Sequence, residues 1–319
     1  MTRHPGYKRA QVATVAAVVI TYNAEDTIEE CLRSLRWADQ VLVVDSESTD
    51  RTVELAQRLA DRVVMEPWRG FSEQKNYAAS VATEEWILHV DADEIVPPEL
   101  AAEIRSVIAA PEKVVGYLIP RQTFWLGHWI RHNGWYPDYS TRLYRRHRAR
   151  WEGLVHEQVV ADGAVGTLRH PLRHYSYGSV QEHLERMVLR LAPLEAREAV
   201  ERGIRVYRFF PFAPLSALVR QWWRGPRSAH RLREAYKDVI KNRVEVAWLI
   251  PFMPLLRFLY MYVLRLGFLD GAPGFWVATL SAFYEAARQA KIWEHFHSRG
   301  EGIVGLDQRL GQSQSSRRV

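Results

Sequence analysis

The chain has 319 residues, of which 47% are hydrophobic and 25% are charged, enough for one large globular domain or a domain with an appendage. A formal net charge of +6 suits partners that carry phosphate, namely nucleic acid, anionic lipid or a nucleotide. The single cysteine, Cys31, excludes an intrachain disulfide and a cysteine-based zinc site, and it fits a reducing compartment.

The first apolar run of the chain, Val12–Ile20, follows the basic residues Arg3, Lys8 and Arg9, as the apolar run of a signal peptide would. However, the run is rich in β-branched residues and leads into a helix pattern. We therefore interpret it as a strand over Val15–Thr21.

Strand and helix patterns alternate as far as residue 110. The predicted strands are Val15–Thr21, Val41–Val44, Val63–Met65 and Trp86–Val90. The predicted helices carry Ile28, Cys31, Leu32 and Leu35 after a cap at Asp26; Val53, Ala56, Leu59 and Ala60 after a cap at Asp50; Ser72–Val81; and Leu100, Ile104, Val107 and Ile108 after Pro97 and Pro98. This alternation predicts an α/β fold with a mostly parallel sheet, whose ligands bind beyond the carboxyl ends of the strands.

The fourth predicted strand runs directly into three acids, Asp91, Asp93 and Glu94. Like charges this close repel one another, so we expect a cation beside them. Side chains two apart on an extended segment point the same way, so Asp91 and Asp93 can face one Mg²⁺ or Mn²⁺ that also binds phosphate oxygens. The alternative is that one of them only caps the helix after Pro97.

Other polar residues gather at the same predicted edge. Asp45 ends the second strand, where a carboxylate can accept hydrogen bonds from a base or ribose, or can stabilise the turn. Tyr22 and Asn23 follow the first strand and can line the same pocket. Lys75 and Asn76 lie on a predicted helix, from which they reach a nucleotide or form a solvated face.

The pattern changes after residue 113, where aromatic, arginine and histidine residues become frequent, and it becomes helical from residue 179. We predict an N-terminal extension (1–11), an α/β domain (12–178) with halves 12–112 and 113–178, a helical amphipathic region (179–305) and a disordered tail (306–319).

Two segments of the helical region, Val246–Leu264 and Arg205–Trp223, mix aromatic, proline and arginine residues. The first approaches the length of a bilayer span, but Arg257 lies inside it, and a charge in mid-bilayer costs at least roughly 2.5 kcal/mol. We therefore expect both segments to lie in the membrane interface. Core helices packed on the α/β domain and a true span are the alternatives.

Four ordered motifs carry a resemblance to a known family: VVITYNAEDTIEECLRSL, VLVVDSESTDRT, FSEQKNYA and ILHVDADE. Together they resemble the inverting family 2 glycosyltransferases of the GT-A fold, whose sheet is Rossmann-like, over roughly residues 12 to 175. Two further pieces are similar to the lipopolysaccharide core branch of heptose β-1,4-glucosyltransferases: TRLYRRHRARWEGLVHEQV and RFLYMYVLRLGFLDGAPGFWVATLSAFYEAARQAKIWE.

The resemblance implies roles for residues of the donor side. The matching positions are Thr21, Tyr22, Asn23 and Asp45 for the nucleobase and ribose, Lys75 and Asp91 for the nucleotide, and Asp93 with Asp91 for Mg²⁺ or Mn²⁺. The chain departs from the family pattern at Asp45-Ser46-Glu47, where Asp-Asp or Asp-Ser-Gly is usual, and at His89, where an apolar residue is usual. These departures leave the base specificity open.

On the acceptor side the resemblance points to His156 and Glu157. Glu157 matches the general base, which takes the proton of an acceptor hydroxyl, and His156 orients the acceptor or contacts the diphosphate. The alternative is a core contact or a surface salt bridge. Glu94 and Asp138 are the reserve candidates for the base.

Three arginines precede this pair: Arg142, Arg145 and Arg146. Arginine binds phosphate bidentately, so we expect one of them to hold the diphosphate and the others to meet an anionic acceptor or lipid headgroup.

The resemblance then implies the reaction. A metal neutralises the diphosphate leaving group, and attack from the opposite face turns an α-linked donor into a β-linked product. The implied donor is a UDP-hexose such as UDP-glucose, and the implied acceptor is a lipid-linked or lipopolysaccharide-core saccharide. The implied location is cytoplasmic, at the inner face of the cell membrane, without a nucleic acid partner.

Three other functions are weighed against this one. A nucleotidyltransferase would place a glycine-rich phosphate loop after the first strand, where this chain has Thr21–Glu25 and no glycine. A nucleic-acid-binding module is disfavoured by dispersed positive charge and by an acidic ligand edge. A noncatalytic membrane-associated scaffold would have no need of Asp91, Asp93 and Glu157.

Overall fold

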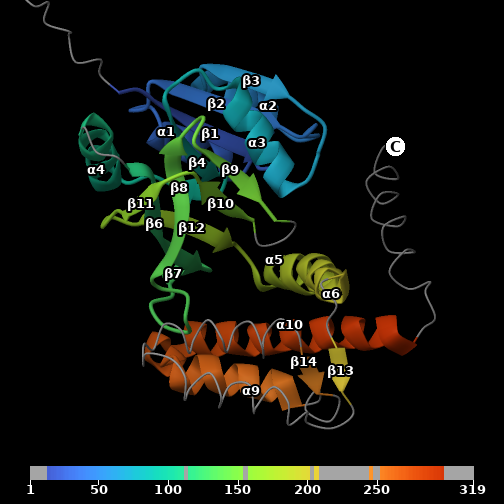
Figure 1. Cartoon of the computed structure of the whole chain (residues 1–319). Helices are drawn as coiled ribbons and strands as arrows, with labels where there is room; N and C mark the ends of the chain where they lie inside the picture. Colours follow the sequence, from blue (N-terminus) through green and yellow to red (C-terminus); the bar gives the residue numbers. More distant parts are fainter. Residues whose placement is uncertain are drawn as a thin grey trace, which may run out of the picture. The chain divides into compact units, whose positions relative to one another are not determined.

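The computed structural model describes residues 13–110, 114–153, 157–201, 205–207, 244–246 and 252–297 (Figure 1). The chain divides into two compact units, Met1–Gly178 and Ser179–Val319. Several predicted features lie outside the described residues: His156, the extension 1–11, the tail 306–319 and most of the segment Arg205–Trp223.

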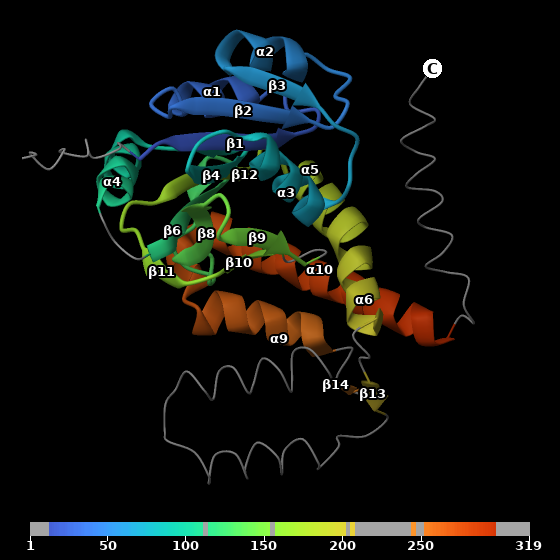
Figure 2. The same cartoon turned by 45° about the horizontal axis from the view of Figure 1, so that its top comes forward.

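The first unit begins with four parallel strands that alternate with helices (Figure 2). The strands are β1 (Val15–Thr21), β2 (Gln40–Asp45), β3 (Arg62–Met65) and β4 (Trp86–Asp91), and the helices are α1 (Ile28–Ser34), α2 (Thr52–Leu59), α3 (Phe71–Val81) and α4 (Pro98–Ala109). The strands lie in the order β3-β2-β1-β4. The predicted strands, their parallel pairing and their alternation with helices are confirmed.

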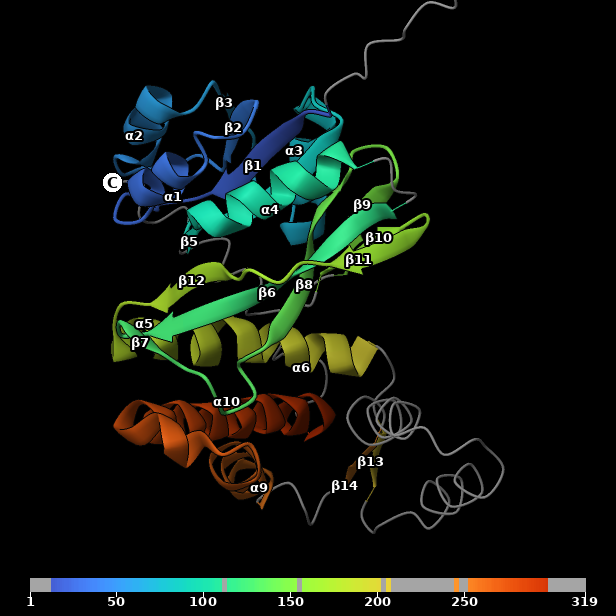
Figure 3. The ribbon, with the colours of Figure 1, turned by 90° about the vertical axis from the view of Figure 1, so that its left-hand side faces the viewer.

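Both faces of this parallel half are covered. Val15, Ala17 and Val19 of β1 pack with α1 and α4 on one face, whereas Ala16 and Val18 pack with α3 on the other, and all five are fully buried. Figure 3 shows α1 and α4 on one side of β1 and α3 on the other. Burial on both faces explains why the strand appears in the sequence as an unbroken apolar run.

The rest of the sheet is mixed. Its strands are β5 (Glu94–Ile95), β6 (Val114–Trp125), β7 (His128–Trp129), β8 (Asp138–Arg145), β11 (Ala164–Thr167) and β12 (Leu172–Tyr177). In the described part of the chain, ten strands form one sheet along the path β3-β2-β1-β4-β8-β6-β12-β5, with β7 and β11 paired to β6. Strand β8 runs antiparallel to both β4 and β6, so its first residues lie near the edge where β4 ends and its last residues lie beside the start of β4.

A separate antiparallel pair, β9 (Ala149–Glu152) and β10 (Gln158–Ala161), packs near α3. Helix α3 holds it through side chains: the Asn76 side chain donates to Trp151 O (2.9 Å) and accepts from Trp151 N (2.8 Å). Ser72 Oγ also donates to Gly153 O at 2.6 Å. These bonds fix the start of the segment that leads to Glu157.

Two local predictions are wrong. Asp26 does not cap α1, because the Ala24 carbonyl accepts from the N–H groups of Thr27 (3.1 Å) and Ile28 (2.9 Å), and the helix begins at Ile28. The segment Asp91-Ala92-Asp93 is not extended, because β4 ends at Asp91 and residues 92–93 form a turn before β5. The two carboxylates therefore do not lie on one face of a strand.

The second unit is mostly helical where it is described. Its elements are α5 (Val180–Leu184), η1 (Glu185–Leu191), α6 (Ala192–Glu201), α9 (Met253–Leu259), η4 (Tyr260–Leu264), η5 (Gly267–Asp270) and α10 (Gly271–His297), with short strands β13 (Arg205–Tyr207) and β14 (Val244–Val246). The long helix α10 lies beside both α9 and α6 (Figures 1 and 3). No described helix has both the length and the apolar character needed to cross a bilayer.

Candidate active site

The carboxyl ends of β1, β2 and β4 meet at one edge of the sheet. In the strand register Thr21 pairs with Asp45, and Ile20 pairs with Asp91. The predicted meeting of these three strand ends is confirmed. It places the side chains that follow each strand within reach of one ligand.

The edge of β2 forms a polar corner around Asp45, which is fully buried. Its carboxylate accepts from Ser48 N (2.7 Å) and Ser48 Oγ (2.5 Å). Asn23, with a left-handed backbone (φ +47°), accepts from Thr49 N at 2.8 Å, while Tyr22 is 49% exposed. The corner therefore offers hydroxyl groups and one aromatic face to the solvent, while the carboxylate of Asp45 holds the turn.

At the end of β4, Asp91 lies between two cations. Arg142 Nη2 donates to Asp91 Oδ2 at 2.7 Å, and Lys75 Nζ is 3.7 Å from Asp91 Oδ1. Burial by itself raises the pKa of Asp91, but the charges of Arg142 and Lys75 outweigh burial and hold that pKa well below its ordinary value. Asp91 is therefore ionised at neutral pH, and its side chain remains 31% exposed to solvent.

Arg142 reaches this edge from β8 and is 3% exposed. Its Nη2 also donates to Glu94 Oε1 at 3.0 Å. Among the described residues, no acceptor meets Nε or Nη1 of Arg142. Unsatisfied buried donors are costly, so these N–H groups favour an anionic ligand at this position.

Glu94 is fully buried, and both of its oxygens are used: Oε1 by Arg142 and Oε2 by Asp91 N, at 2.9 Å. Burial raises its pKa. Its selection as a reserve base is therefore wrong, since it stabilises the end of β4 and does not face an acceptor. The other reserve candidate, Asp138, is 42% exposed and accepts from Arg121 Nε at 2.9 Å.

Asp93 lies in the turn after β4, and its side chain is 18% exposed. His174 Nε2, on β12, is 3.6 Å from Asp93 Oδ2. Among the described residues, no group of three or more His, Cys, Asp or Glu side chains is arranged to hold a metal ion by itself. Asp91 and Asp93 thus offer oxygen ligands suited to Mg²⁺ or Mn²⁺, but only part of a coordination shell.

Lys75 links this edge to Glu157. Its side chain is 3% exposed, and Nζ lies 2.6 Å from Glu157 Oε1 and 4.3 Å from the centre of the Trp151 ring. Residue Glu157, which precedes β10, has a side chain that is 16% exposed. The structure thus links four predicted site residues by ion pairs: Asp91, Lys75, Arg142 and Glu157.

His89 lies beneath this group and is fully buried. Its Nε2 is 3.2 Å from the Lys75 carbonyl oxygen, and its ring meets Trp151 edge-on with centroids 5.4 Å apart. Burial, followed by the charge of Lys75, lowers the pKa of His89 to about 3. His89 is thus a neutral packing residue that supports α3, where the family usually has an apolar side chain.

Arg145 and Arg146 do not join the site. Strand β8 runs antiparallel to β4, so Arg145 pairs with Trp86 at the opposite end of β4. Its guanidinium forms an ion pair with Glu85 and lies 4.6 Å from the Trp86 ring. Arg146 Nη1 donates to the Ala82 carbonyl at 2.6 Å. Of the three arginines considered for the diphosphate, Arg142 lies at the correct end of the strand.

Three residues with roles at this edge were missed: Arg121, His174 and Trp151. Arg121 Nη1 lies 4.0 Å from Glu94 Oε1, and His174 pairs in register with Glu94. The sequence holds no signal for Arg121 or His174, since the pairings of β6 and β12 bring them here. Trp151 had a signal, because it opens the WEGLVHEQV motif.

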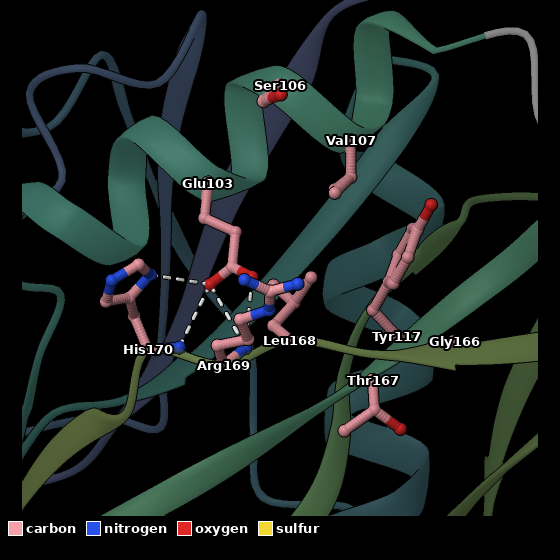
Figure 4. A pocket seen from close by; sticks show the side chains of 9 residues that line it. All are labelled: Glu103, Ser106, Val107, Tyr117, Gly166, Thr167, Leu168, Arg169 and His170. Atoms are coloured by element: carbon pink, nitrogen blue, oxygen red, sulfur yellow. Dashed lines mark hydrogen bonds and ion pairs between the residues drawn. The ribbon is translucent and has the colours of Figure 1, made fainter.

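One surface pocket of about 530 Å³ lies elsewhere, between α4 and the strands β6 and β11 (Figure 4). Glu103 there accepts from Arg169 N (3.0 Å), His170 N (2.9 Å) and His170 Nδ1 (2.8 Å). This carboxylate holds the connection between β11 and β12, and none of the predicted site residues lines the pocket.

Known proteins resemble this chain in sequence and in fold. The model of the family described as Glycosyl transferase family 2 matches residues 16–174. The lipopolysaccharide core biosynthesis glycosyltransferase LpsC of Rhizobium meliloti (strain 1021) is 30% identical over 221 residues, which cover 66% of this chain and 81% of LpsC. An uncharacterized glycosyltransferase of Rickettsia bellii (strain RML369-C) is 34% identical over 187 residues, covering 53% of this chain and 62% of the relative.

A solved structure shares the fold at lower sequence identity. The mannosyltransferase PcManGT from Pyrobaculum calidifontis, in complex with GDP-Man and Mn²⁺, superposes with a TM-score of 0.50 at 16% identity. The match covers 88% of this chain and 87% of that one. The first unit therefore has a GT-A-like α/β fold.

Proposed function

Because the chain belongs to glycosyl transferase family 2, we propose that it transfers a hexosyl group from a nucleotide sugar, such as UDP-glucose, to a saccharide acceptor with inversion at the anomeric carbon. The observation that carries this proposal is the meeting of Asp91, Lys75, Arg142 and Glu157 at one sheet edge. Each residue supplies a charge that sugar transfer from a nucleoside diphosphate needs.

On the donor side, Asp45 and Asn23 define the corner beside which the base and ribose would lie. Two buried guanidinium nitrogens of Arg142, Nε and Nη1, can donate to phosphate oxygens, since no acceptor among the described residues meets them. Asp93 and Asp91 would hold Mg²⁺ or Mn²⁺, with phosphate oxygens and water completing the shell. When bound, the metal would stabilise the charge that develops on the leaving diphosphate.

On the acceptor side, Glu157 would remove the proton of the attacking hydroxyl. A base on the face opposite the nucleotide leads to inversion in one displacement, so an α-linked donor yields a β-linked product. Such a route uses no covalent enzyme intermediate. Asp138, exposed and paired with Arg121, would be the second choice for the base.

For the acceptor, we propose a lipid-linked or lipopolysaccharide-core saccharide at a membrane surface. LpsC, a relative of this chain, is a lipopolysaccharide core biosynthesis glycosyltransferase. Large apolar side chains of the helical unit are exposed, among them Leu255 (55%), Leu264 (72%) and Leu269 (57%). Arg265, also exposed, lies among them and suits an anionic headgroup.

Calorimetric titration tests the donor assignment. UDP, GDP and CDP are each titrated into the full chain with and without Mn²⁺, and into Asp93→Ala. We expect one nucleotide to bind in a metal-dependent way, and this binding to weaken at least tenfold in the variant, as for loss of a charged ligand. Failure of all three nucleotides to bind would refute the transferase proposal.

Flotation with vesicles tests the membrane assignment. The full chain is mixed with vesicles of phosphatidylglycerol and phosphatidylethanolamine, and with vesicles of neutral phosphatidylcholine. We expect cofloating with the anionic vesicles and less with the neutral ones, because an apolar face and basic residues act together. No cofloating with either vesicle would refute a membrane-bound acceptor.

A further inference from the structure

One buried ammonium, that of Lys75, is shared by two carboxylates that the proposed reaction uses separately. Lys75 Nζ is 2.6 Å from Glu157 Oε1, a charge-assisted hydrogen bond, and 3.7 Å from Asp91 Oδ1, an ion pair without a hydrogen bond. Glu157 is therefore the first partner of the ammonium and Asp91 the second.

The surroundings of Lys75 hold its ammonium close to these two carboxylates. The Trp151 ring lies 4.3 Å from Nζ, and the side chain is 3% exposed. The Asn76 and Ser72 side chains fasten the Trp151–Gly153 segment to the same helix. The helix thus fixes both the backbone of Lys75 and the Trp151–Gly153 segment, so the terminal Nζ is the movable part of the lysine.

The present pairing conflicts with catalysis. While Nζ holds Glu157 Oε1, that oxygen is not available to an acceptor hydroxyl, and the ammonium stabilises the carboxylate against taking up a proton. A diphosphate beside Asp91 would bring several anionic oxygens toward the second partner of the ammonium. Lysine is a flexible point charge with three donors, so it can exchange one anionic partner for another.

We propose that Lys75 is a donor-responsive positioning residue. In the free protein it holds Glu157, and when a nucleoside diphosphate binds beside Asp91 it turns to a phosphate oxygen and releases Glu157 toward the acceptor. The inference rests on the proposed function, because it requires a diphosphate at this edge. It makes the base available only when the donor is bound.

Competition for one ammonium has a measurable consequence in binding alone. If Glu157 competes with the diphosphate, weakening its hold on Lys75 must tighten nucleotide binding, because coupling between two partners of one group is reciprocal. Glu157→Gln keeps the size of the side chain and removes its charge. We expect this variant to bind the diphosphate roughly fivefold to tenfold more tightly, the scale of one charge-assisted hydrogen bond.

The experiment is calorimetry of UDP and GDP at fixed Mn²⁺ with the full chain and four variants: Glu157→Gln, Glu152→Gln, Lys75→Met and Lys75→Met/Glu157→Gln. Glu152→Gln is the matched control, because it removes one exposed charge from the same segment without touching Lys75. Among the single variants, we expect tighter nucleotide binding in Glu157→Gln only. Adding Glu157→Gln to Lys75→Met should not tighten nucleotide binding further. Uridine and guanosine, which carry no phosphate, should bind wild type and Glu157→Gln equally.

The outcomes separate this inference from the proposed function. If wild type binds no nucleotide, both are refuted. If UDP or GDP binds but Glu157→Gln binds no tighter than Glu152→Gln, or if the nucleosides show the same tightening, only the role of Lys75 is refuted. Thermal melts establish that each variant is folded. Should Lys75→Met not fold, Lys75→Arg keeps the charge and must retain the tightening caused by Glu157→Gln.

Discussion

The two units of the molecule differ in emphasis: among the described residues, fully buried ion pairs are concentrated in the α/β unit, and exposed large apolar side chains are concentrated in the helical unit. The α/β unit buries the charged residues Lys75, Glu94 and Arg142 and gives each an oppositely charged partner. The helical unit leaves large apolar residues exposed, such as Leu264 at 72% and Phe283 at 60%. Buried charge and exposed apolar surface are both costly, so each marks a place where a partner belongs. The first arrangement suits a charged small molecule, and the second suits a surface.

The largest effect is expected from Arg142→Gln. It leaves the fully buried carboxylate of Glu94, and the partly exposed carboxylate of Asp91, without their shared cation, so the free energy of unfolding should fall by about 3–5 kcal/mol. Chemical denaturation of the full chain measures the change. This result would sharpen the contrast, since it would show that the α/β unit depends on pairing of its buried charges.

Arg145→Gln is the matched control, with the same chemical change on the same strand. Its partner Glu85 has a side chain that is 50% exposed, so the loss should be roughly 0–1 kcal/mol. We assign Arg142 to the charged edge and Arg145 to the opposite end of the strand. If both substitutions destabilise the protein equally, this assignment is contradicted.

A second effect concerns catalysis. Glu157→Gln should lower the transfer rate about 100-fold or more, because the attacking hydroxyl loses its base. Product formation from the nucleotide sugar identified by titration measures the rate. Glu152→Gln, exposed and on the same segment, should stay within about twofold of wild type. Full activity of Glu157→Gln would move the base elsewhere, with Asp138 as the next residue to test.

A third effect lies inside the helical unit. Burial, followed by the charge of Arg186, lowers the pKa of His183 to about 4. In the unfolded chain a histidine takes up its proton near pH 6.5. As the pH falls from about 6.5 to about 4, the unfolded state therefore binds a proton that the folded state does not, and the free energy of unfolding decreases. Between pH 7 and pH 5, the titration of His183 should lower the free energy of unfolding of the wild type by about 2 kcal/mol.

His183→Gln removes this titration, so its loss of stability from pH 7 to pH 5 should be about 2 kcal/mol smaller than that of wild type. Denaturant titrations at both pH values measure it, with exposed His147→Gln as the control. If His183→Gln loses as much stability at pH 5 as wild type does, His183 is not shielded from solvent, and the interior of the helical unit is more open to water than that of the α/β unit.

The smallest effect is expected at the exposed apolar surface. Leu256→Glu with Leu264→Glu should weaken binding to phosphatidylglycerol vesicles about tenfold, because two apolar contacts are lost and two negative charges are added. Cosedimentation with vesicles measures it. Val160→Glu is the control, because Val160 is an apolar residue of the α/β unit about as exposed as Leu256, and it should bind like wild type. Similar weakening by both would remove the distinction between the two units.

The sequence alone determined much of the α/β unit. Strands β1, β2 and β4 were predictable because residues buried on both faces form unbroken apolar runs, and the polar residues at their ends, Asp45 and Asp91, follow directly in the chain. The ordered motifs indicated the family for the same reason: they lie on local segments whose spacing is fixed by one strand and the turn after it.

Tertiary structure decided which charges meet. Arg142 and Arg145 are three residues apart on one strand and look equivalent in the sequence, yet the antiparallel register of β8 against β4 places them toward opposite ends of the sheet. Glu94 follows Asp93 directly, yet it is buried behind Arg142. Lys75 meets Glu157, which is 82 residues away. Such pairings depend on strand register and helix packing between distant segments, which no local period of the sequence encodes.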